Sequence, residues 1–232
     1  GMYCNYFWMS YETYSLLESA WVFDFYVGNK YDHNYQYDGG VVSYYNTEYK
    51  VLANVFEVSN KPENTSEALK AVSVSFTRVA DVTYTIKIYT NLTNKNNPLS
   101  GIEQEQAATV GTTAYAGIYT IPLKNIVELE SGSTFAVVVS TDKPALDYEQ
   151  SYSTVDFDKK SPIWDNNVSM GNNKSFCFSG GRFYAWYWGN ECIKAFTTDS
   201  ETTKIEILTQ PANAESDGYG RAVSVAVEAR GN

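Results

Sequence analysis

The chain has 232 residues, of which 27 are acidic and 17 are Lys or Arg, giving a formal net charge of −10. This length is enough to bury the core of one large domain without the help of a metal or a disulfide. The acidic balance excludes nucleic acid as a favoured partner, because nucleic-acid binding rests on Lys and Arg contacts to phosphate. No apolar run approaches the roughly 18 residues of a membrane-spanning helix, so we predict no membrane span.

Aromatic residues make up 16% of the chain, and 20 of them are Tyr. Tyr favours β-strands because its ring fits a half-buried pleated surface. Aromatic rings are also frequent at binding surfaces, where they offer contact area at low entropic cost. Most of these rings are expected simply to pack the faces of sheets.

Alternation of apolar and polar residues indicates strands in chain order from residue 71 onwards. Within 71–79, Val72, Val74 and Phe76 face one way and small polar residues face the other, and 83–90 repeats the pattern. The link at 80–82 suits a hairpin loop between these two strands. Further strands are predicted at 118–123, 134–140 and 192–198.

Helical signals are weak, and only 66–70 is predicted as a turn of helix, with Thr65 or Ser66 as its N-cap. Long stretches rich in Asn, Ser, Thr and Gly are predicted as loops; they are 91–114, 141–161 and 165–181. Short alternating strands joined by polar loops favour an all-β fold. We predict an antiparallel β-sandwich of jelly-roll type.

The C-terminal tail differs from the rest of the chain. Two strands are predicted at 204–208 and 222–229, flanking a Pro- and Gly-containing stretch. They are interpreted as the opening of another small β module or, alternatively, as an edge ribbon on the main domain. The domain boundary is placed near 198–202.

The three cysteines, Cys4, Cys177 and Cys192, form no C-x-x-C pair and no zinc-binding spacing. Cys177 and Cys192 could close a disulfide loop, and two free buried thiols are equally compatible with the sequence. No motif with a fixed metal or cofactor spacing occurs, so we predict no cofactor and no metal.

The densest aromatic cluster is 182–189, with the sequence RFYAWYWG. Strand alternation would place Tyr184, Trp186 and Trp188 on one face and Tyr187 on the other. Three rings in register would form a platform on which a sugar ring can stack. Because both faces are apolar, a strand buried on both sides is an equally good interpretation.

Two further candidates for ligand binding lie outside this cluster. Trp164 is predicted to lie in a loop, where a role in the core is harder to assign. His33 and Asp38 lie in the aromatic and acidic run 31–38, which is either a ligand-facing loop or a strand edge before the turn at Gly39. The structural interpretation of the run is preferred, and both residues are kept as candidates.

Several segments, taken in order, resemble one known family; they are 31–40 (YDHNYQYDGG), 53–56 (ANVF), 69–72 (LKAV), 84–90 (YTIKIYT), 116–121 (AGIYTI), 132–139 (GSTFAVVV) and 192–197 (CIKAFT). This family is the lectin-like domain that follows papain-like cysteine peptidase domains in secreted proteins of anaerobic Gram-positive bacteria. The resemblance covers residues 28–199.

The two ends of the chain carry weaker resemblances. Residues 6–11 (YFWMSY) are similar to the closing strand of a papain-like peptidase, although Cys4 and Asn5 replace the usual Asn-Gly. Residues 207–213 (ILTQPAN) are similar to the entry strand of bacterial immunoglobulin-like repeats. The resemblance therefore implies a peptidase remnant at 1–27, a lectin-like sandwich at 28–199 and the start of an immunoglobulin-like module at 200–232.

The resemblance implies no catalysis, because the family's catalytic Cys, His and Asn all precede the closing strand. We therefore expect a non-catalytic extracellular or cell-surface module that binds a glycan or cell-wall saccharide and targets a larger protein to a surface. The alternative is a structural accessory domain of a cysteine peptidase with no ligand of its own. Its other expected partners are the neighbouring domains of the parent chain.

Overall fold

The computed structural model describes most of the middle of the chain; the described residues are 28, 30–39, 44–60, 65–150, 152–155, 162–166, 174–201, 205–209 and 228–231. The chain divides into two compact units, residues 1–30 and 31–232. The segment predicted as a peptidase remnant, 1–27, lies outside the described residues, and so does most of the predicted module at 200–232. The three domain assignments remain predictions.

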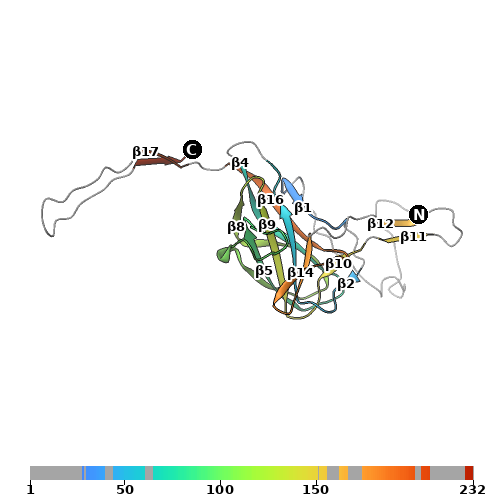
Figure 1. Cartoon of the computed structure of the whole chain (residues 1–232). Coiled ribbons are helices and arrows are strands. Elements are labelled where there is room, and N and C mark those ends of the chain that lie inside the picture. The colour runs from blue at the N-terminus through green and yellow to red at the C-terminus, as the bar shows by residue number, and fades with distance from the viewer. Residues whose placement is uncertain are drawn as a thin grey trace, which may run out of the picture. The chain divides into compact units, whose positions relative to one another are not determined.

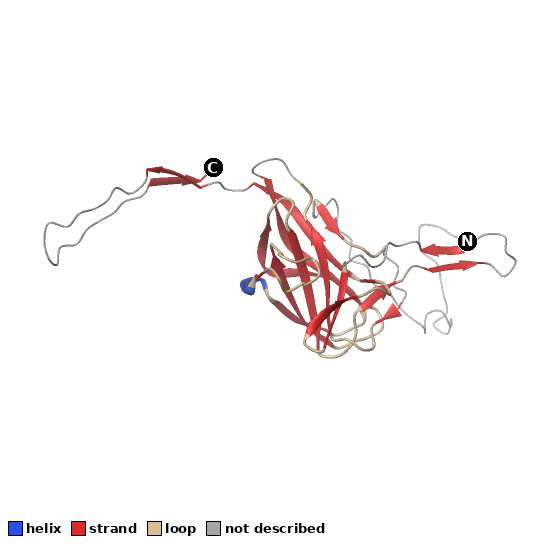
Figure 2. Ribbon diagram, in the orientation of Figure 1, coloured by secondary structure: helices blue, strands red, loops and turns tan. Residues whose placement is uncertain are grey.

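The fold is all-β, as predicted, and every strand pairing is antiparallel (Figures 1 and 2). The first main sheet consists, in spatial order, of β1 (His33–Tyr35), β16 (Ile193–Glu201), β4 (Thr65–Phe76) and β8 (Gly117–Leu129). The second main sheet consists of β14 (Arg182–Ala185), β13 (Ser175–Ser179), β3 (Val51–Glu57), β9 (Thr134–Thr141), β5 (Val82–Thr90) and β6 (Ile102–Glu103), with β7 (Thr109–Thr113) also paired to β5.

Smaller elements complete the described structure. A three-stranded sheet contains β15 (Asn190–Glu191), β10 (Asp147–Glu149) and β2 (Tyr44–Tyr45). Two separate ribbons are formed by β11 (Tyr152–Val155) with β12 (Pro162–Asn166) and by β17 (Ile205–Thr209) with β18 (Glu228–Gly231). A single turn of 3-10 helix, η1, spans Glu105–Ala107.

The core joins the two main sheets, as a sandwich requires. One cluster of buried side chains takes members from β4 and β8 of the first sheet and from β3, β5 and β9 of the second. Its largest fully buried side chains are aromatic, and Phe56 and Phe135 lie with their ring centroids 5.4 Å apart. The predicted inward positions Val72, Val74 and Phe76 are all fully buried in this cluster, which confirms that they face the core.

Strands β3 and β9 are apolar on both faces. Ala53, Val55, Ala136 and Val138 form a second buried cluster with Phe176 on the side away from the main core. Strands buried on both faces carry continuous apolar runs rather than alternation. This explains why the sequence of β9 is an unbroken run from Phe135 to Val139.

The predicted hairpin at 80–82 is wrong, although both flanking strands are present. β4 belongs to the first sheet and β5 to the second, so the link between them crosses from one sheet to the other. Buried Asp147 holds this crossing, since its Oδ2 accepts hydrogen bonds from Ser75 Oγ (2.6 Å) and Thr77 N (2.7 Å). Short polar links serve both geometries, and their composition does not distinguish them.

The predicted helical turn at 66–70 is also wrong, because these residues form the first half of β4. This half is paired with β16 on one side and with β8 on the other. Two ladders of backbone hydrogen bonds outweigh a local helical preference that is worth less than about 1 kcal/mol per residue. The stretches predicted as loops likewise contain short strands, among them β7, β10 and β13.

Asn54 of β3 links the two main sheets through a fully buried polar network. Its Nδ2 donates to the carbonyl oxygens of Glu191 and Ile193, both at 3.0 Å. Its Oδ1 accepts from Ser175 Oγ (2.7 Å), which in turn accepts from the Glu191 backbone N–H (3.0 Å). The network fixes the start of β16 against β3.

Replacing Asn54 with alanine is expected to lower the free energy of unfolding by about 3 kcal/mol, because three buried hydrogen bonds are lost together. Equilibrium urea unfolding measures the difference. Asn96→Ala is the matched control, since Asn96 is exposed and its loss should change the stability by less than about 0.5 kcal/mol. Equal effects of the two substitutions would contradict the role assigned to the network.

Candidate functional site

A hollow of about 350 Å³ lies where β13 and β14 meet the segment that follows them; it is lined by Tyr49, Cys177, Ser179, Tyr184, Ala185, Trp186, Tyr187 and Trp188. Its volume falls within the range of small-ligand sites. Among the lining residues, five are aromatic. The hollow therefore contains the three rings that the sequence predicted as a stacking platform, Tyr184, Trp186 and Trp188.

Local sequence explains how these rings are presented. β13 and β14 form a hairpin whose turn residues, Gly180 and Gly181, have positive φ values of 56° and 84°. Two positive φ values are what a tight two-residue hairpin turn needs, and glycine adopts them without strain. At the other end, a Cβ at Gly189 would lie 2.5 Å from the carbonyl oxygen of Glu149, so only glycine lets the segment approach β10.

The predicted alternation over 182–189 holds only in part, because the strand ends at Ala185. Residues 186–189 are not in a strand. Tyr187 lines the same hollow as Trp186 and Trp188. Tyr187, predicted on the opposite face, thus borders the same hollow, and the arrangement of the rings on two faces remains a prediction.

Trp186 lines the hollow and is held in place by contacts with the core. Its ring is half-buried against the main core and lies edge-on to Tyr49 (5.8 Å) and Tyr148 (5.6 Å). Its backbone N–H donates to the Ser175 carbonyl at 2.8 Å. Edge-to-face contacts of this kind stabilise and orient a ring, so Trp186 positions the hollow more than it offers contact area.

Three other rings remain open to solvent. Tyr184 is 40% exposed, Tyr187 is 66% exposed and Trp188 is 68% exposed. The Arg182 guanidinium lies 4.5 Å from the Tyr184 ring centroid, and its Nε donates to Tyr184 Oη. Large apolar groups left exposed side by side mark interaction surfaces, and here hydrogen-bond donors lie at their edge.

Two of the cysteines are buried, and one of them, Cys177, lines the hollow. Cys177 and Cys192 are both buried and free, which settles the alternatives left open by the sequence. Burial raises the pKa of the Cys177 thiol, and the nearby Glu191 carboxyl raises it further. Burial also raises the pKa of Cys192 well above its usual value. A thiol with a raised pKa stays protonated near neutral pH and is a poor nucleophile.

The other predicted site residues lie elsewhere. Asp38 is buried, and its Oδ2 pairs with Lys194 Nζ at 2.6 Å, a contact that fits the structural interpretation of the run 31–38. Trp164 lies in strand β12 opposite Thr154, not in a loop, and its side chain lies outside the described residues. Asp38 does not line the hollow, and the ligand-binding roles of both residues remain predictions.

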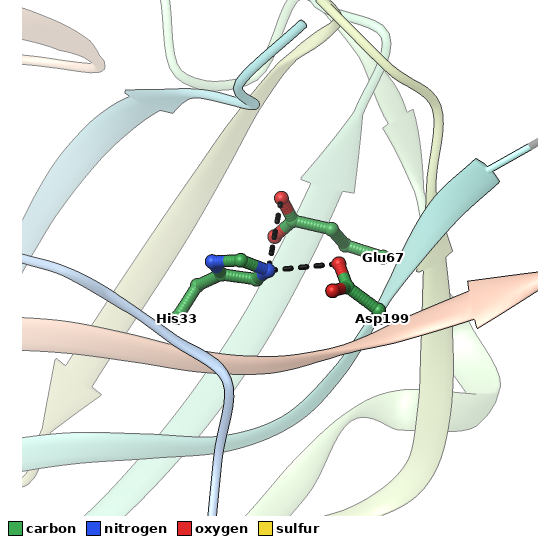
Figure 3. A group of neighbouring side chains, drawn as sticks. All are labelled: His33, Glu67 and Asp199. Atoms are coloured by element: carbon green, nitrogen blue, oxygen red, sulfur yellow. Dashed lines mark hydrogen bonds and ion pairs between the residues drawn. The ribbon is translucent and has the colours of Figure 1, made fainter. Parts of the chain in front are cut away.

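His33 also lies away from the hollow, in the first main sheet. Its Nε2 is 2.8 Å from Asp199 Oδ1 and 3.9 Å from Glu67 Oε1 (Figure 3). One imidazole nitrogen and two carboxylates form a set of atoms able to ligate a metal ion, within 4.8 Å of one another. Glu67 and Asp199 were absent from the sequence prediction, because the three residues share no local spacing.

Sequence reasoning also missed Tyr49, which reaches the hollow from the loop before β3, and Arg182, which flanks Tyr184. No local sequence pattern distinguishes Tyr49 from the other Tyr residues of its polar stretch. Arg182 opens the aromatic run, two residues before Tyr184, and this spacing on a strand is the signal that indicates their contact. Among the described residues, no helix is long and apolar enough to cross a membrane.

Comparisons with known proteins agree with this architecture. A family model described as a lectin like domain matches residues 34–197. A search of curated proteins gives no match. A solved structure of the clostridial cysteine protease Cwp84 after propeptide cleavage has a TM-score of 0.50 and 21% identity, covering 72% of this chain and 40% of that one.

A second solved structure contains the cysteine protease and lectin-like domains of Cwp84, a surface layer associated protein of Clostridium difficile. It has a TM-score of 0.44 and 24% identity, covering 64% of this chain and 32% of that one. The chain therefore spans well under half the length of either solved protein.

Proposed function

Because the chain belongs to the lectin-like domain family, we propose that it is a non-catalytic carbohydrate-binding module that targets a larger extracellular protein to a cell surface. The observation that carries this proposal is the hollow with Tyr184, Tyr187 and Trp188 exposed at its border. Its expected ligand is a glycan or cell-wall saccharide.

The chemistry of the hollow suits a sugar. The axial C–H groups of a pyranose pack on the face of an aromatic ring, and this contact removes apolar ring surface from water. Arg182 and Ser179 supply hydrogen-bonding groups beside the rings, as sugar hydroxyls require. The net charge of −10 repels polyanionic saccharides, so a neutral glycan is the favoured class.

Two observations support a role without catalysis. Burial raises the pKa of the Cys177 thiol at the hollow, which favours its protonated form. The single His of the chain, His33, contacts carboxylates in the other main sheet. Glycoside hydrolysis uses a pair of carboxylates across the scissile bond. The described residues that line the hollow include no Asp or Glu.

A second candidate function is that of an accessory domain that packs on a cysteine peptidase and has no ligand of its own. The observation in its favour is that the fold matches part of a cysteine protease chain, Cwp84. The description of Cwp84 as surface layer associated suits a cell-surface location in either case. Glycan binding distinguishes the two candidates.

Trp188→Ala is expected to weaken glycan binding about 10-fold or more, the effect of losing about 1.4 kcal/mol of ring stacking. Because Trp188 is 68% exposed, the substitution should leave the melting temperature nearly unchanged. A glycan array probed with the whole chain identifies ligands, and the affinities of wild type and variant for the strongest one are then compared.

Tyr115→Ala is the matched control, since Tyr115 is 78% exposed and does not line the hollow. It should bind like the wild type. A wild-type chain that retains no glycan would favour the accessory function. Equal retention by the wild type and Trp188→Ala would move the site elsewhere, and Trp164→Ala would be measured next.

A further inference from the structure

Three neighbouring strands of the first main sheet bring His33, Glu67 and Asp199 together. His33 lies on β1, Glu67 on β4 and Asp199 on β16, in the spatial order β1-β16-β4 (Figure 1). Asp199 is directly opposite Glu67, and His33 is directly opposite Thr197, two residues before Asp199. Residues that face each other across strands, or lie two apart in one strand, share a face of the sheet. The register therefore directs all three side chains to one point.

A β-bulge turns Glu67 towards this point. The pairing of β4 with β16 shifts at Lys70, so that Phe196 is opposite Ala71 while Thr197 is opposite Leu69. The extra residue reverses the alternation of the strand. Without it, Glu67 and Leu69 would face away from the core that contains Val72. With it, Leu69 and Glu67 are both fully buried.

The resulting arrangement places like charges together. Carboxylates directly opposite each other across two strands repel, and Glu67 is fully buried while Asp199 is exposed. A buried carboxylate is stable when it is paired or coordinates a metal. Nε2 of His33 lies within 4 Å of both carboxylates (Figure 3).

Neighbouring hydroxyl groups already orient the carboxylate of Glu67. Tyr35 Oη lies 2.8 Å from both Glu67 oxygens, and Thr197 Oγ1 donates to Oε2 at 2.5 Å. The Asp199 backbone N–H donates to Asp32 Oδ2 at 2.9 Å, which fixes the backbone of β16 at this residue. Metal sites use outer-shell hydrogen bonds of this kind to hold their ligands in place.

From this geometry we infer that His33, Glu67 and Asp199 form a binding site for a first-row transition dication such as Zn²⁺. Imidazole and carboxylate ligands together suit Zn²⁺, whereas Ca²⁺ and Mg²⁺ prefer all-oxygen sets. When Zn²⁺ binds, it replaces the hydrogen bond between His33 Nε2 and Asp199 Oδ1. Nε2 then ligates the metal, and a proton on Nε2 is released to solvent or is carried on Nδ1 instead. Three protein ligands leave at least one position for water or an outside donor.

A metal bound at this site would also hold β1, β16 and β4 together. β1 has only three residues, and it follows directly after the first compact unit, residues 1–30. A metal that ligates β1, β4 and β16 together stabilises the folded state by its binding free energy. The site is independent of the aromatic hollow, because it lies in the other main sheet and shares no lining residue with it.

Calorimetric titration of the tag-free whole chain with ZnCl₂ tests the site. The wild type is expected to bind one Zn²⁺ per chain with a Kd of about 10 μM or tighter. Asp199→Asn and His33→Ala should each weaken binding by about 100-fold or more. Losing an outer-shell partner alone costs only about 10- to 100-fold in affinity. Tyr35→Phe, which removes such a partner, should fall in the smaller range.

Glu57→Gln is the matched control, since Glu57 is an exposed carboxylate in the other main sheet, paired with Lys95, and should bind like the wild type. Visible absorption of the Co²⁺ form provides a second readout, with d–d bands that disappear in His33→Ala. Asp199→Asn keeps the side-chain shape at an exposed position, so misfolding does not account for its loss. Absence of wild-type binding, or equal binding by the wild type and both ligand variants, would overturn the inference.

Discussion

Phe135→Ala is expected to lower the free energy of unfolding by about 3–5 kcal/mol, the usual cost of truncating a fully buried Phe. Phe135 has no exposed surface; its ring lies edge-on to Tyr35 at 5.6 Å and tilted against Phe56 at 5.4 Å. It thereby joins β1 of the first main sheet to β3 and β9 of the second. Truncation leaves a cavity that these rings fill only in part, and urea unfolding monitored by circular dichroism measures the loss.

Phe178→Ala is the control for this prediction. Phe178 is half-buried and contacts Phe183 across the β13–β14 hairpin at 5.1 Å. Because the exposed side of its ring leaves no enclosed cavity, the loss should be less than half of that for Phe135→Ala. Losses of equal size would mean that the core does not lie between the two main sheets.

Glu191→Gln is expected to stabilise the protein increasingly as the pH rises. Glu191 is fully buried, and neither of its carboxylate oxygens has a hydrogen-bond partner among the described residues. Burial raises its pKa well above the usual value, and nearby Asp147 raises it further. The folded chain therefore holds this proton to a higher pH than the unfolded chain does.

The sign of the effect follows from proton linkage. Below the pKa of unfolded Glu, both states are protonated, so the ionisation of this carboxyl changes the stability of neither protein. Between that pKa and the raised pKa of the folded state, the wild type loses about 1.4 kcal/mol of stability for each pH unit. Gln does not titrate, so the variant lacks this loss. Urea unfolding at intervals from pH 4 to pH 8 should show the two proteins diverging.

Glu103→Gln is the control of opposite sign. The hydrogen bond from Lys87 lowers the pKa of Glu103, and the hydrogen bond from Tyr89 lowers it further. Its contribution to stability is present above the unfolded pKa and is lost as the pH falls through the folded one. Glu103→Gln should therefore destabilise slightly at neutral pH and not at all in acid. A Glu191→Gln difference that is independent of pH would show that the carboxyl is not buried as described.

The strands of the fold were predictable where one face is buried. The strands predicted at 71–79, 83–90, 118–123, 134–140 and 192–198 correspond to β4, β5, β8, β9 and β16, each of which has a face in the shared core. Pairing was not predictable from local pattern, since the link 77–81 crosses between sheets under the control of Asp147, which lies about 70 residues away. The helical prediction for residues 66–70 was wrong for the same reason: their extended conformation depends on pairing with β16 and β8, which are distant in the sequence.

The candidate site was predictable in its local part alone. The run 182–189 already contains Tyr184, Trp186 and Trp188, and these residues line one hollow. Tyr49 reaches the same hollow from a distant part of the sequence, which no spacing within the run indicates. His33 and Asp199 are 166 positions apart, so their proximity depends on the pairing of β1 with β16 and on the bulge in β4.

Sugars are expected to bind in the aromatic hollow, and NMR of the indole N–H groups provides a direct test of this contact. The chain has five Trp residues, each giving one indole signal that single Trp→Phe substitutions assign. On titration with the strongest ligand from the glycan array, we expect the Trp188 signal to shift most and the Trp186 signal to follow. Saturable binding that leaves both signals in place would contradict the claim.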